Sequence, residues 1–368
     1  MARETARLNV VEVVDVDACT DPRWRDLVAD AGGSLFHGVA WSTVLADTYG
    51  FAPRALVALD GGRVRSGIPW CHVRDPGGER IVSLPFSDYC GPIGAPPFTP
   101  LFDALVARGL PVRCRVLVDT DAPDTDAPDT DAPDTSDATR VGVRSTKRAR
   151  WHGVPVTVAP EVDTWPELGA STRRAVAKAR REGVEVVARP DPEFVACFFA
   201  LHAGVRTHKY RLLPQPRAFF TTMRDRFAAT DDWFPLAAVR DGEVIAATVF
   251  VRHHDTLFYK FNASDPAGLA ARPNDLLLWS GIELAAHLGC RLLDLGASDD
   301  DQPGLVRFKR GFGASEREIR TLVAGPPPPE DAEQFQHVLR RITRTVTAPG
   351  VPEALAEEAG AWLYRYFA

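Results

Sequence analysis

The residue types best suited to chemistry lie at residues 289–313, which read GCRLLDLGASDDDQPGLVRFKRGFG. A leucine-rich run predicts a buried strand, which Asp294 interrupts and Gly296 ends at a turn. A carboxylate inside such a strand needs a polar partner. Three aspartates at 299–301 and the pair Phe308-Lys309 follow in what we expect to be a Gly- and Pro-rich loop. Polar groups thus converge beside a strand end, where ligand sites form in α/β folds, and a carboxylate and an ammonium group there suit proton transfer and anion stabilisation.

The same residues also have a purely structural explanation. An aspartate at a strand end often forms a turn or caps a helix, and an acidic triplet is usually a solvated loop. The residue pattern alone therefore leaves both interpretations open.

The order of strand, Asp-Leu-Gly at 294–296, variable loop and Phe-Lys-x-x-Phe-Gly at 308–313 resembles a known signature. It is similar to the C-terminal signature of the Fem-type aminoacyl transferases and their GNAT-like N-acyltransferase relatives. The resemblance covers about residues 30–320. Three further segments contribute to it, namely residues 83–93 (SLPFSDYCGPI), 171–184 (STRRAVAKARREGV) and 201–215 (LHAGVRTHKYRLLPQ).

This resemblance implies an α/β (α+β) fold of two tandem GNAT-like domains, each a mixed, mostly antiparallel sheet flanked by helices. We expect a first domain at residues 1–165 and a second, with the transfer site, at 166–325. A Pro-rich linker and two short C-terminal helices would follow at 326–368. In the second half, strands at 234–239, 244–253 and 256–263 with helices before and after them follow the GNAT order.

The composition is that of an ordinary globular protein, with 45% hydrophobic and 25% charged residues. The net charge of −6 is misleading, because residues 119–137 contain eight aspartates and no base. The repeat DTDAPDT there cannot bury a core, so we expect residues 119–139 to be a disordered insertion. Without a signal peptide or an apolar stretch long enough to cross a bilayer, the sequence predicts a cytoplasmic protein.

Metal binding is not expected. The six cysteines have no CxxC spacing, and the adjacent His253 and His254 would point to opposite faces of a strand. No carboxylate stands at a suitable spacing around His202 and His208. We therefore expect no bound cofactor, and only a co-substrate.

The resemblance suggests roles for individual residues, because direct acyl transfer needs a neutral amine, a positioned carbonyl group and donors for an oxyanion. Lys309 would stabilise the oxyanion or bind donor phosphate, Asp294 or Asp88 would accept the amine proton, and Tyr259 would hydrogen-bond in the donor groove. The remaining candidates would bind substrate. They are Phe308 against acceptor or ribose, Arg206, Lys209 and Tyr210 near acceptor phosphate, Asp88 and Tyr89 in the acceptor groove, and Arg174 on a basic helix that could contact phosphate.

One missing motif bears on the donor. Coenzyme A-dependent GNAT enzymes place a Gly-rich turn before the helix that follows the fourth strand, where backbone amides cradle the pyrophosphate. Residues 265–275 (DPAGLAARPND) lack that pattern. Aminoacyl-tRNA is thus the first expectation, for transfer to an amine of a cell-wall precursor or related acceptor. Two alternatives stay open: an acyl-CoA-dependent N-acyltransferase acting on a sugar amine or small metabolite, and a non-catalytic GNAT-like binding module.

Overall fold

The computed structural model describes residues 11–118, 143–156 and 168–368. The insertion expected at 119–139 and the domain boundary expected at 165 lie outside these described residues, and both stay predictions. The described strands are, in chain order, β1 (Glu12–Asp17), β2 (Pro53–Asp60), β3 (Arg63–Asp75), β4 (Gly78–Val82), β5 (Ile93–Gly94), β6 (Val112–Val118), β7 (Arg144–Pro155), β8 (Glu185–Ala188), β9 (Trp233–Arg240), β10 (Glu243–His253), β11 (Thr256–Ser264), β12 (Leu292–Ser298) and β13 (Ser315–Ala324).

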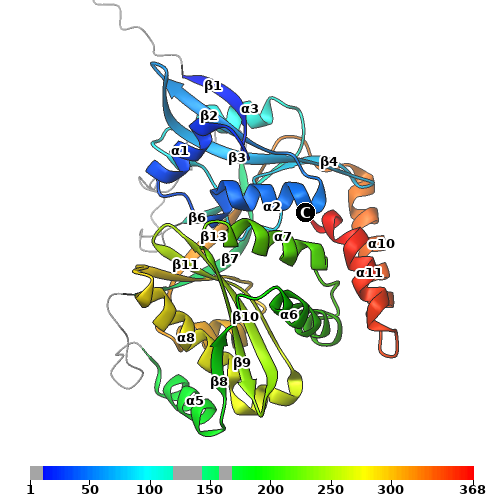
Figure 1. Ribbon diagram of the computed structural model, residues 1–368. Helices are drawn as coiled ribbons and strands as arrows, with labels where there is room; N and C mark the ends of the chain where they lie inside the picture. Colours follow the sequence, from blue (N-terminus) through cyan, green and yellow to red (C-terminus); the bar gives the residue numbers. More distant parts are fainter. Residues whose placement is uncertain (1–10, 119–142, 157–167) are drawn as a thin grey trace, which may run out of the picture.

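Helices lie on both sides of the sheet that these strands form (Figure 1). The short helices are η1 (Leu35–His37), a π-helix η2 (Val205–Tyr210), η3 (Pro266–Ala271) and η4 (Tyr364–Phe367). The α-helices are α1 (Pro22–Asp30), α2 (Val39–Tyr49), α3 (Thr99–Val106), α5 (Ala170–Arg181), α6 (Glu193–Gly204), α7 (Arg217–Ala228), α8 (Pro273–His287), α9 (Pro303–Arg310), α10 (Glu330–Val346) and α11 (Glu353–Leu363).

Hydrogen bonds join the described strands into a single sheet of thirteen. The order is β1-β2-β3-β4-β6-β13-β7-β12-β11-β10-β9-β8, and β5 pairs with β3. The antiparallel β9-β10-β11 meander expected from the sequence is present. Among the described strands, only β4–β6 and β11–β12 pair in parallel.

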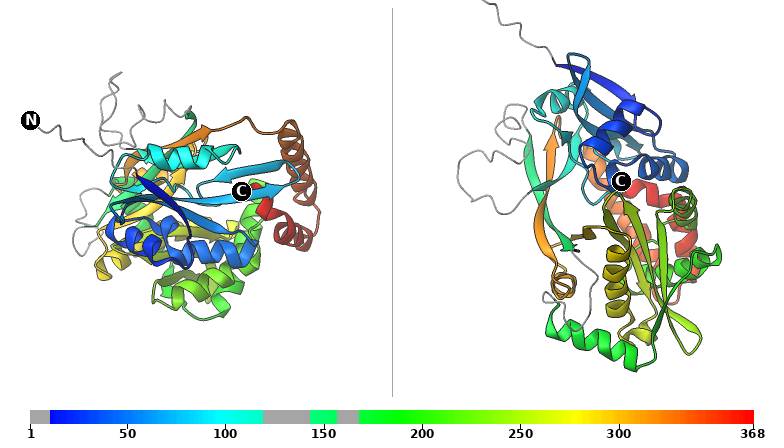
Figure 2. Two further views of the ribbon diagram at one scale, coloured as in Figure 1. Left: turned by 90° about the horizontal axis from the view of Figure 1, so that it is seen from above. Right: turned by 60° about the vertical axis from the view of Figure 1, so that its left-hand side comes forward.

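Strand β13 joins the two halves of the sheet. It pairs antiparallel with β6 on one side and with β7 on the other, so a strand from the second half of the chain lies between two strands of the first. No strand was predicted there, because charged residues occupy four of the ten positions of SEREIRTLVA and mask the alternation. The two halves consequently share a continuous sheet (Figure 2).

The β8–β12 half of the sheet is buried on both faces. Alternate residues of β10 point to opposite sides: Val249 and Val251 pack towards α2, α6 and α7, and Phe250 packs towards α8. Helix α8 lies so close that a Cβ atom on Gly281 would be 2.4 Å from the Phe250 ring. This packing anchors the strands that carry the site.

Local sequence signals locate some helix ends correctly and others not. Asp21 caps α1 through its side chain, with Pro22 in the first turn, as expected. Ser171 and Thr172 are residue types that favour a helix cap, but α5 begins before both of them, at Ala170, with Gly169 as its cap. The expected C-terminal helices are present as α10 and α11, which stand beside β4 and α6 (Figure 1).

Candidate active site

Strands β11 and β12 run side by side only briefly. They pair in parallel from Thr256 to Phe258, and beyond that point they separate. A bulge at Lys260 interrupts the β10–β11 pairing, and a second irregularity follows Asp294 in the β12–β7 pairing. Diverging strands leave backbone groups and side chains free to line a cavity.

The Lys260 bulge also changes which side chains share a face. Strict alternation would place Phe258 opposite Phe261, but both pack in the cluster formed with α2, α6 and α7. Strict alternation fails here because a bulge inserts one residue and shifts the pattern. Tyr259 instead packs on the other face, 5.5 Å from Phe250 between ring centroids.

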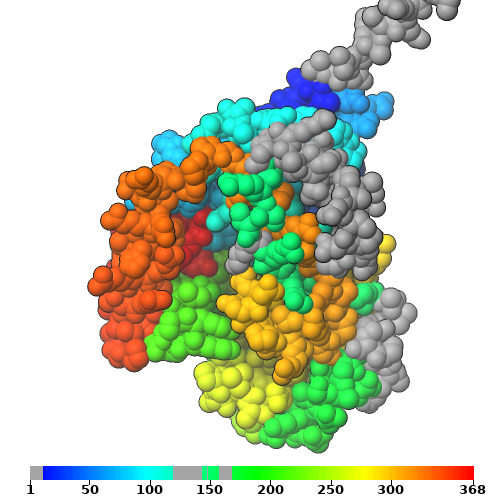
Figure 3. Space-filling view, turned by 180° about the vertical axis from the view of Figure 1, so that it is seen from behind, coloured from blue at the N-terminus to red at the C-terminus, as the bar shows by residue number. Residues whose placement is uncertain are grey.

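A cavity of about 660 Å³ opens where the two strands diverge, between the two halves of the chain. Its charged lining residues are Asp88, Arg113 and Arg115 from the first half and Lys260 and Lys309 from the second. On this side of the molecule, Figure 3 shows a recess beside α10, with the C-terminal residues in red at its back. Residues 364, 367 and 368 belong to the cavity lining.

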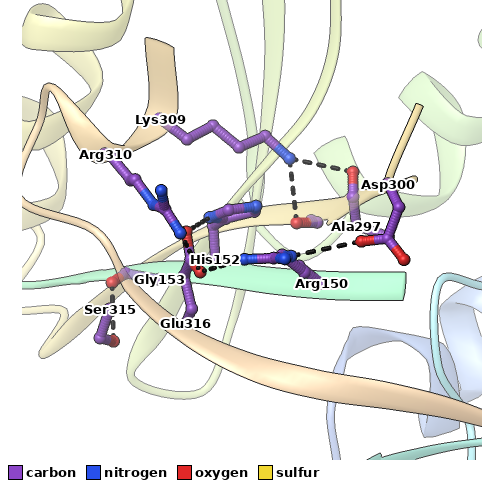
Figure 4. Close-up of polar contacts among 10 residues, drawn as sticks. Arg150, His152, Gly153, Ala297, Asp300, Lys309, Arg310, Ser315 and Glu316 are labelled. Carbon is purple, nitrogen blue, oxygen red and sulfur yellow. Dashed lines mark hydrogen bonds and ion pairs between the residues drawn. The ribbon is translucent and has the colours of Figure 1, made fainter. Parts of the chain in front are cut away.

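Lys309 is presented by α9, where the sequence analysis expected an irregular loop. That expectation was wrong, because Pro303 sits in the first turn of a helix that runs to Arg310. The Lys309 side chain is only 3% exposed, and its Nζ donates to the carbonyl oxygens of Gly296 at 3.0 Å and Ala297 at 2.9 Å (Figure 4). Burial lowers the pKa of Lys309 to about 8, against the opposing effect of Asp88 and Asp294.

Asp294 lies deeper, beneath the cavity. Its Oδ2 accepts hydrogen bonds from Tyr89 Oη and Trp151 Nε1, both at 2.8 Å, and its Oδ1 accepts one from the Gly296 amide at 2.6 Å. Burial raises the pKa of Asp294 to about 6, although these three hydrogen bonds favour the carboxylate. The strand carboxylate therefore has its polar partners, and two of them, Tyr89 and Trp151, come from the other half of the chain.

Asp88 is the carboxylate that faces the cavity. Its Oδ2 lies 3.4 Å from Lys260 Nζ, and the Asp88 side chain keeps 30% of its exposure. Burial acts to raise the pKa of Asp88, but Lys260, Arg115 and Lys309 outweigh it, so the pKa is lower than usual. The lack of a side chain at Gly296 lets the Asp88 carboxylate lie close to the backbone there, because a Cβ atom at this position would be 3.0 Å from Asp88 Oδ2.

Lys260 is a residue of the site that the sequence analysis did not assign. Its ammonium group lies 4.4 Å from the centroid of the Phe36 ring and 5.0 Å from that of Trp41. Such faces attract a cation and replace part of its hydration. A lysine inside the aromatic run Phe258–Phe261 was the available signal.

His152 is a second residue that the sequence analysis did not assign. It is fully buried on β7, and its Nδ1 lies 3.5 Å from Glu316 Oε1 (Figure 4). Burial and the nearby Lys309 lower the pKa of His152 to about 4, so the ring is neutral. Glu316 is held in turn by Arg310 and Arg150 (Figure 4).

The other predicted site residues are divided between the cavity and more distant places. Tyr259 lines the cavity, and burial raises its pKa. Phe308 packs against Phe312 at 5.2 Å between ring centroids. Arg206 donates from Nε to the carbonyl oxygen of Leu213 at 3.1 Å.

Phe308, Arg206 and Tyr89 are not among the residues that line this cavity, and three further predicted binding residues lie away from it. Lys209 and Tyr210 border a separate pocket of about 380 Å³ beside the π-helix η2. Arg174 is exposed on α5, at the opposite end of the molecule from β1 (Figure 1). The fold therefore assembles Asp88, Tyr259 and Lys309 around one cavity and leaves these three outside it.

Two further properties concern only the residues that the structure describes. No group of three or more His, Cys, Asp or Glu side chains within them could hold a metal ion. Within the same ranges, no helix has both the length and the apolar character needed to cross a membrane.

Comparisons with known proteins agree with this architecture. Residues 169–310 match the family model described as an acetyltransferase (GNAT) domain. The chain is similar to the crystal structure of FemX, with 12% identity over 89% of this chain and 100% of that chain and a TM-score of 0.62. It is also similar to a tandem GNAT protein from the clavulanic acid biosynthesis pathway, with 15% identity over 86% and 100% of the two chains and a TM-score of 0.54.

A third similar structure is that of L-PGS from Bacillus licheniformis, with 11% identity over 90% of this chain and 99% of that chain and a TM-score of 0.51. No curated protein sequence matches the chain. The predicted resemblance and fold class are thus confirmed: residues 169–310 are a GNAT domain, within a chain that has the fold of FemX and of a tandem GNAT protein.

Proposed function

We propose that this protein is an N-acyltransferase that moves an aminoacyl group from aminoacyl-tRNA to an amine of a cell-wall precursor or related acceptor. The GNAT domain match supports an acyltransferase. The observation that carries the proposal is the placement of Lys309 Nζ, which is held by two carbonyl oxygens of β12 at the edge of a cavity between the halves of the chain.

The two carbonyl contacts leave one position on Lys309 Nζ for a substrate. An ammonium group has three N–H donors, and Gly296 and Ala297 take two of them. The third is available to the oxyanion that forms when an amine attacks a carbonyl carbon. A donor preorganised in this way stabilises the transition state, because it need not reorganise as charge develops.

The reaction needs no enzyme nucleophile. The neutral amine nitrogen attacks the ester carbonyl carbon, a C–N bond forms, and the C–O bond to the tRNA ribose breaks as the tetrahedral intermediate collapses. The amine proton passes to the leaving ribose oxygen. Asp88 is the group we assign to that proton, because it lines the cavity, whereas Asp294 is committed to three hydrogen bonds beneath it.

Asp294 and Tyr89 act as positioning residues in this proposal. Together they hold the start of the β12 irregularity, from which the carbonyl groups that bind Lys309 project. Tyr259 lines the same cavity, and its contact with the donor stays a prediction.

The residues around the start of α8 favour a donor other than coenzyme A. Pro273 contributes no amide hydrogen to that helix start, and the Asp265 side chain already accepts from the Ala267 amide. Gly268 has a packing explanation, because a Cβ atom there would lie 2.8 Å from Ile245 Cβ. Asp275 adds a carboxylate in the first turn, which would repel a pyrophosphate.

A second candidate function is acyl-CoA-dependent N-acylation of a sugar amine or small metabolite. The description of the matched domain as an acetyltransferase favours it. In this reaction the amine attacks a thioester, the C–S bond breaks, and the thiol leaves with the proton. Lys309 and Asp88 would have the same roles with either donor.

Donor discrimination tests the proposal. The full chain is incubated with a pool of radiolabelled aminoacyl-tRNAs, or with radiolabelled acetyl-CoA, together with amines from a cell extract, and new amides are followed. Label transferred from tRNA and abolished by ribonuclease would support the first proposal. Transfer from the thioester alone would replace it with the second, and no transfer from either donor would contradict both.

A further inference from the structure

The cavity has a second cationic region that the acyl-transfer chemistry does not use. Arg113 and Arg115 project from β6 on the same face, because residues two apart in a strand point the same way. Val112, Cys114 and Val116 between and beside them are buried on the opposite face, in a cluster that includes residues of α3. We propose that Arg113 and Arg115 form a subsite for an acidic group, phosphate or carboxylate, carried by the amine acceptor.

The strand that carries the two arginines is held firmly. The Ser83 amide donates to the carbonyl oxygen of Arg113 at 2.9 Å, and the Cys90 amide donates to that of Arg115 at 2.8 Å. On its other side, β6 pairs with β13 over seven residues from Val112 to Val118. The guanidinium groups therefore start from a fixed backbone and not from a loop.

Neither guanidinium group is neutralised within the part of the chain that the structure describes. Neither guanidinium group forms an ion pair or a hydrogen bond with a described residue, and Arg115 Nε is buried without a hydrogen-bond partner. Asp88 is near enough for Arg115 to help lower the pKa of its carboxyl group. Burial lowers the pKa of Arg113, and the neighbouring Arg80 and Arg115 add to the effect. Arg80 itself is occupied by Asp75 and by the backbone oxygen of Ala368.

The charge of the whole cavity points the same way. Among the described side chains that line it, four are cationic, from Arg113, Arg115, Lys260 and Lys309, and one is a carboxylate, from Asp88. The terminal residue Ala368 also lines the cavity, and Arg80 binds its backbone oxygen. Like charges gathered around a cavity repel one another, and an anion bound between them relieves that repulsion. Paired guanidinium groups offer planar N–H donors that match the oxygen atoms of a phosphate or a carboxylate.

This subsite replaces an expectation from the sequence. Arg206 and Lys209 were expected to hold acceptor phosphate, but Arg206 Nε is bound to Leu213 and Lys209 borders the separate pocket beside η2. Arg113 and Arg115 share the cavity with Lys309 and Asp88. An acceptor whose acidic group binds Arg113 and Arg115 would place its amine at the other end of the same cavity. That assignment of the acid to the acceptor rests on the proposed function.

Anion binding tests the subsite without any activity. Isothermal titration with inorganic phosphate, pyrophosphate and citrate compares the wild-type chain with the Arg113→Gln/Arg115→Gln double variant. We expect at least one of these anions to bind roughly tenfold or more weakly to the double variant, because charge-assisted hydrogen bonds are lost. Arg63→Gln, an exposed charge change on β3, is the matched control and should bind as the wild type does. Two results would overturn the subsite. One is that the double variant binds all three anions with the same affinity as the wild type. The other is that the wild type itself binds an adventitious ion only.

Paired acceptors then test which molecule brings the acid, with the donor that the transfer assay identifies. Glucosamine 6-phosphate is compared with glucosamine, and lysine with cadaverine, which lacks its carboxyl group. We expect KM to be lower for the acidic member of one pair. The arginine variants should raise that KM roughly tenfold or more and leave the KM of the neutral member unchanged. The pair that discriminates identifies phosphate or carboxylate, and an Arg115→Lys variant should retain part of the preference.

The two proposals fail in different ways. If no amine is acylated but anion binding still depends on Arg113 and Arg115, the proposed function fails and the subsite stands. If amines are acylated with the same KM in wild type and double variant, the acceptor assignment is wrong and the function stands.

Discussion

The Tyr89 hydroxyl donates a 2.8 Å hydrogen bond to Asp294 Oδ2, and so joins two segments 205 residues apart in the sequence. Tyr89 lies in the loop after β4, and Asp294 lies in β12. The bond connects the two halves of the chain directly beneath the cavity.

Asp294 should make stability depend on pH in an unusual direction. Burial raises its pKa to about 6, above the value in the unfolded chain, so the folded state binds the extra proton between about pH 4 and pH 6. As the pH rises through that window, the wild type should lose up to about 3 kcal/mol relative to Asp294→Asn. Urea unfolding of both proteins across this range measures the difference, with the exposed Asp301→Asn as control. A difference that does not change between pH 4 and pH 7 would contradict the assignment.

Lys309 should govern the pH dependence of turnover. If its third N–H stabilises the oxyanion, kcat should fall as the pH rises through about 8, because the neutral amine loses that donor. Lys309→Met should lower kcat about 100-fold or more and remove this limb of the profile. Arg307→Met, an exposed change on the same helix, should behave as the wild type does. A rate that rises through pH 8 in the wild type and no longer does so in Lys309→Met would mean that neutral Lys309 acts as a base, whereas a rise that persists in the variant would come from deprotonation of the acceptor amine.

Gly296 and Gly289 provide a matched pair for testing the approach of Asp88. Both have φ of +69°, so alanine at either position should destabilise the fold by about 1 kcal/mol through backbone strain. Only at Gly296 would the new Cβ atom meet a neighbour, Asp88 Oδ2 at 3.0 Å, because nothing lies within 4 Å of the corresponding position at Gly289. Transfer activity should therefore fall in Gly296→Ala alone. Equal activity of the two variants would show that Asp88 need not approach this closely.

The ion pair between Asp88 and Lys260 should be worth more than a surface pair. The Lys260 side chain is only 8% exposed, so removing Asp88 leaves a largely desolvated ammonium group without its carboxylate. A double-mutant cycle with Asp88→Asn and Lys260→Met should give a coupling energy of about 1–3 kcal/mol in urea unfolding. The exposed pair Asp47 and Arg226 is the control, with an expected coupling below about 1 kcal/mol. Similar values for both pairs would argue against the desolvated environment.

Patterns of neighbouring residues were sufficient to predict many of the local elements and some of the chemical groups of the site. Alternating and helical patterns predicted the β9-β10-β11 meander and helices α6 to α8, because these depend on neighbours close in the chain. The segments with Asp88, Asp294 and Lys309 were recognised from their residues and order. The helix α9 and strand β13 were missed, since Gly, Pro and charged residues there are typical of loops.

Which of these groups meet depends on contacts between segments that are distant in the sequence. The bulge at Lys260 breaks the alternation of β11, so the strand pattern does not show where the Lys260 side chain points. Lys260 lies beside Asp88 because β10 and β11 pair with this bulge and because the first half of the chain packs against them. Arg113 and Arg115 lie on β6, and β13 pairs with β6 on one side and β7 on the other. Strand β13 comes from roughly 200 residues further along the chain, so this placement needs the folded sheet. The shifted pKa values of Asp294 and Lys309 likewise arise from desolvation, which exists only once distant segments have closed over them.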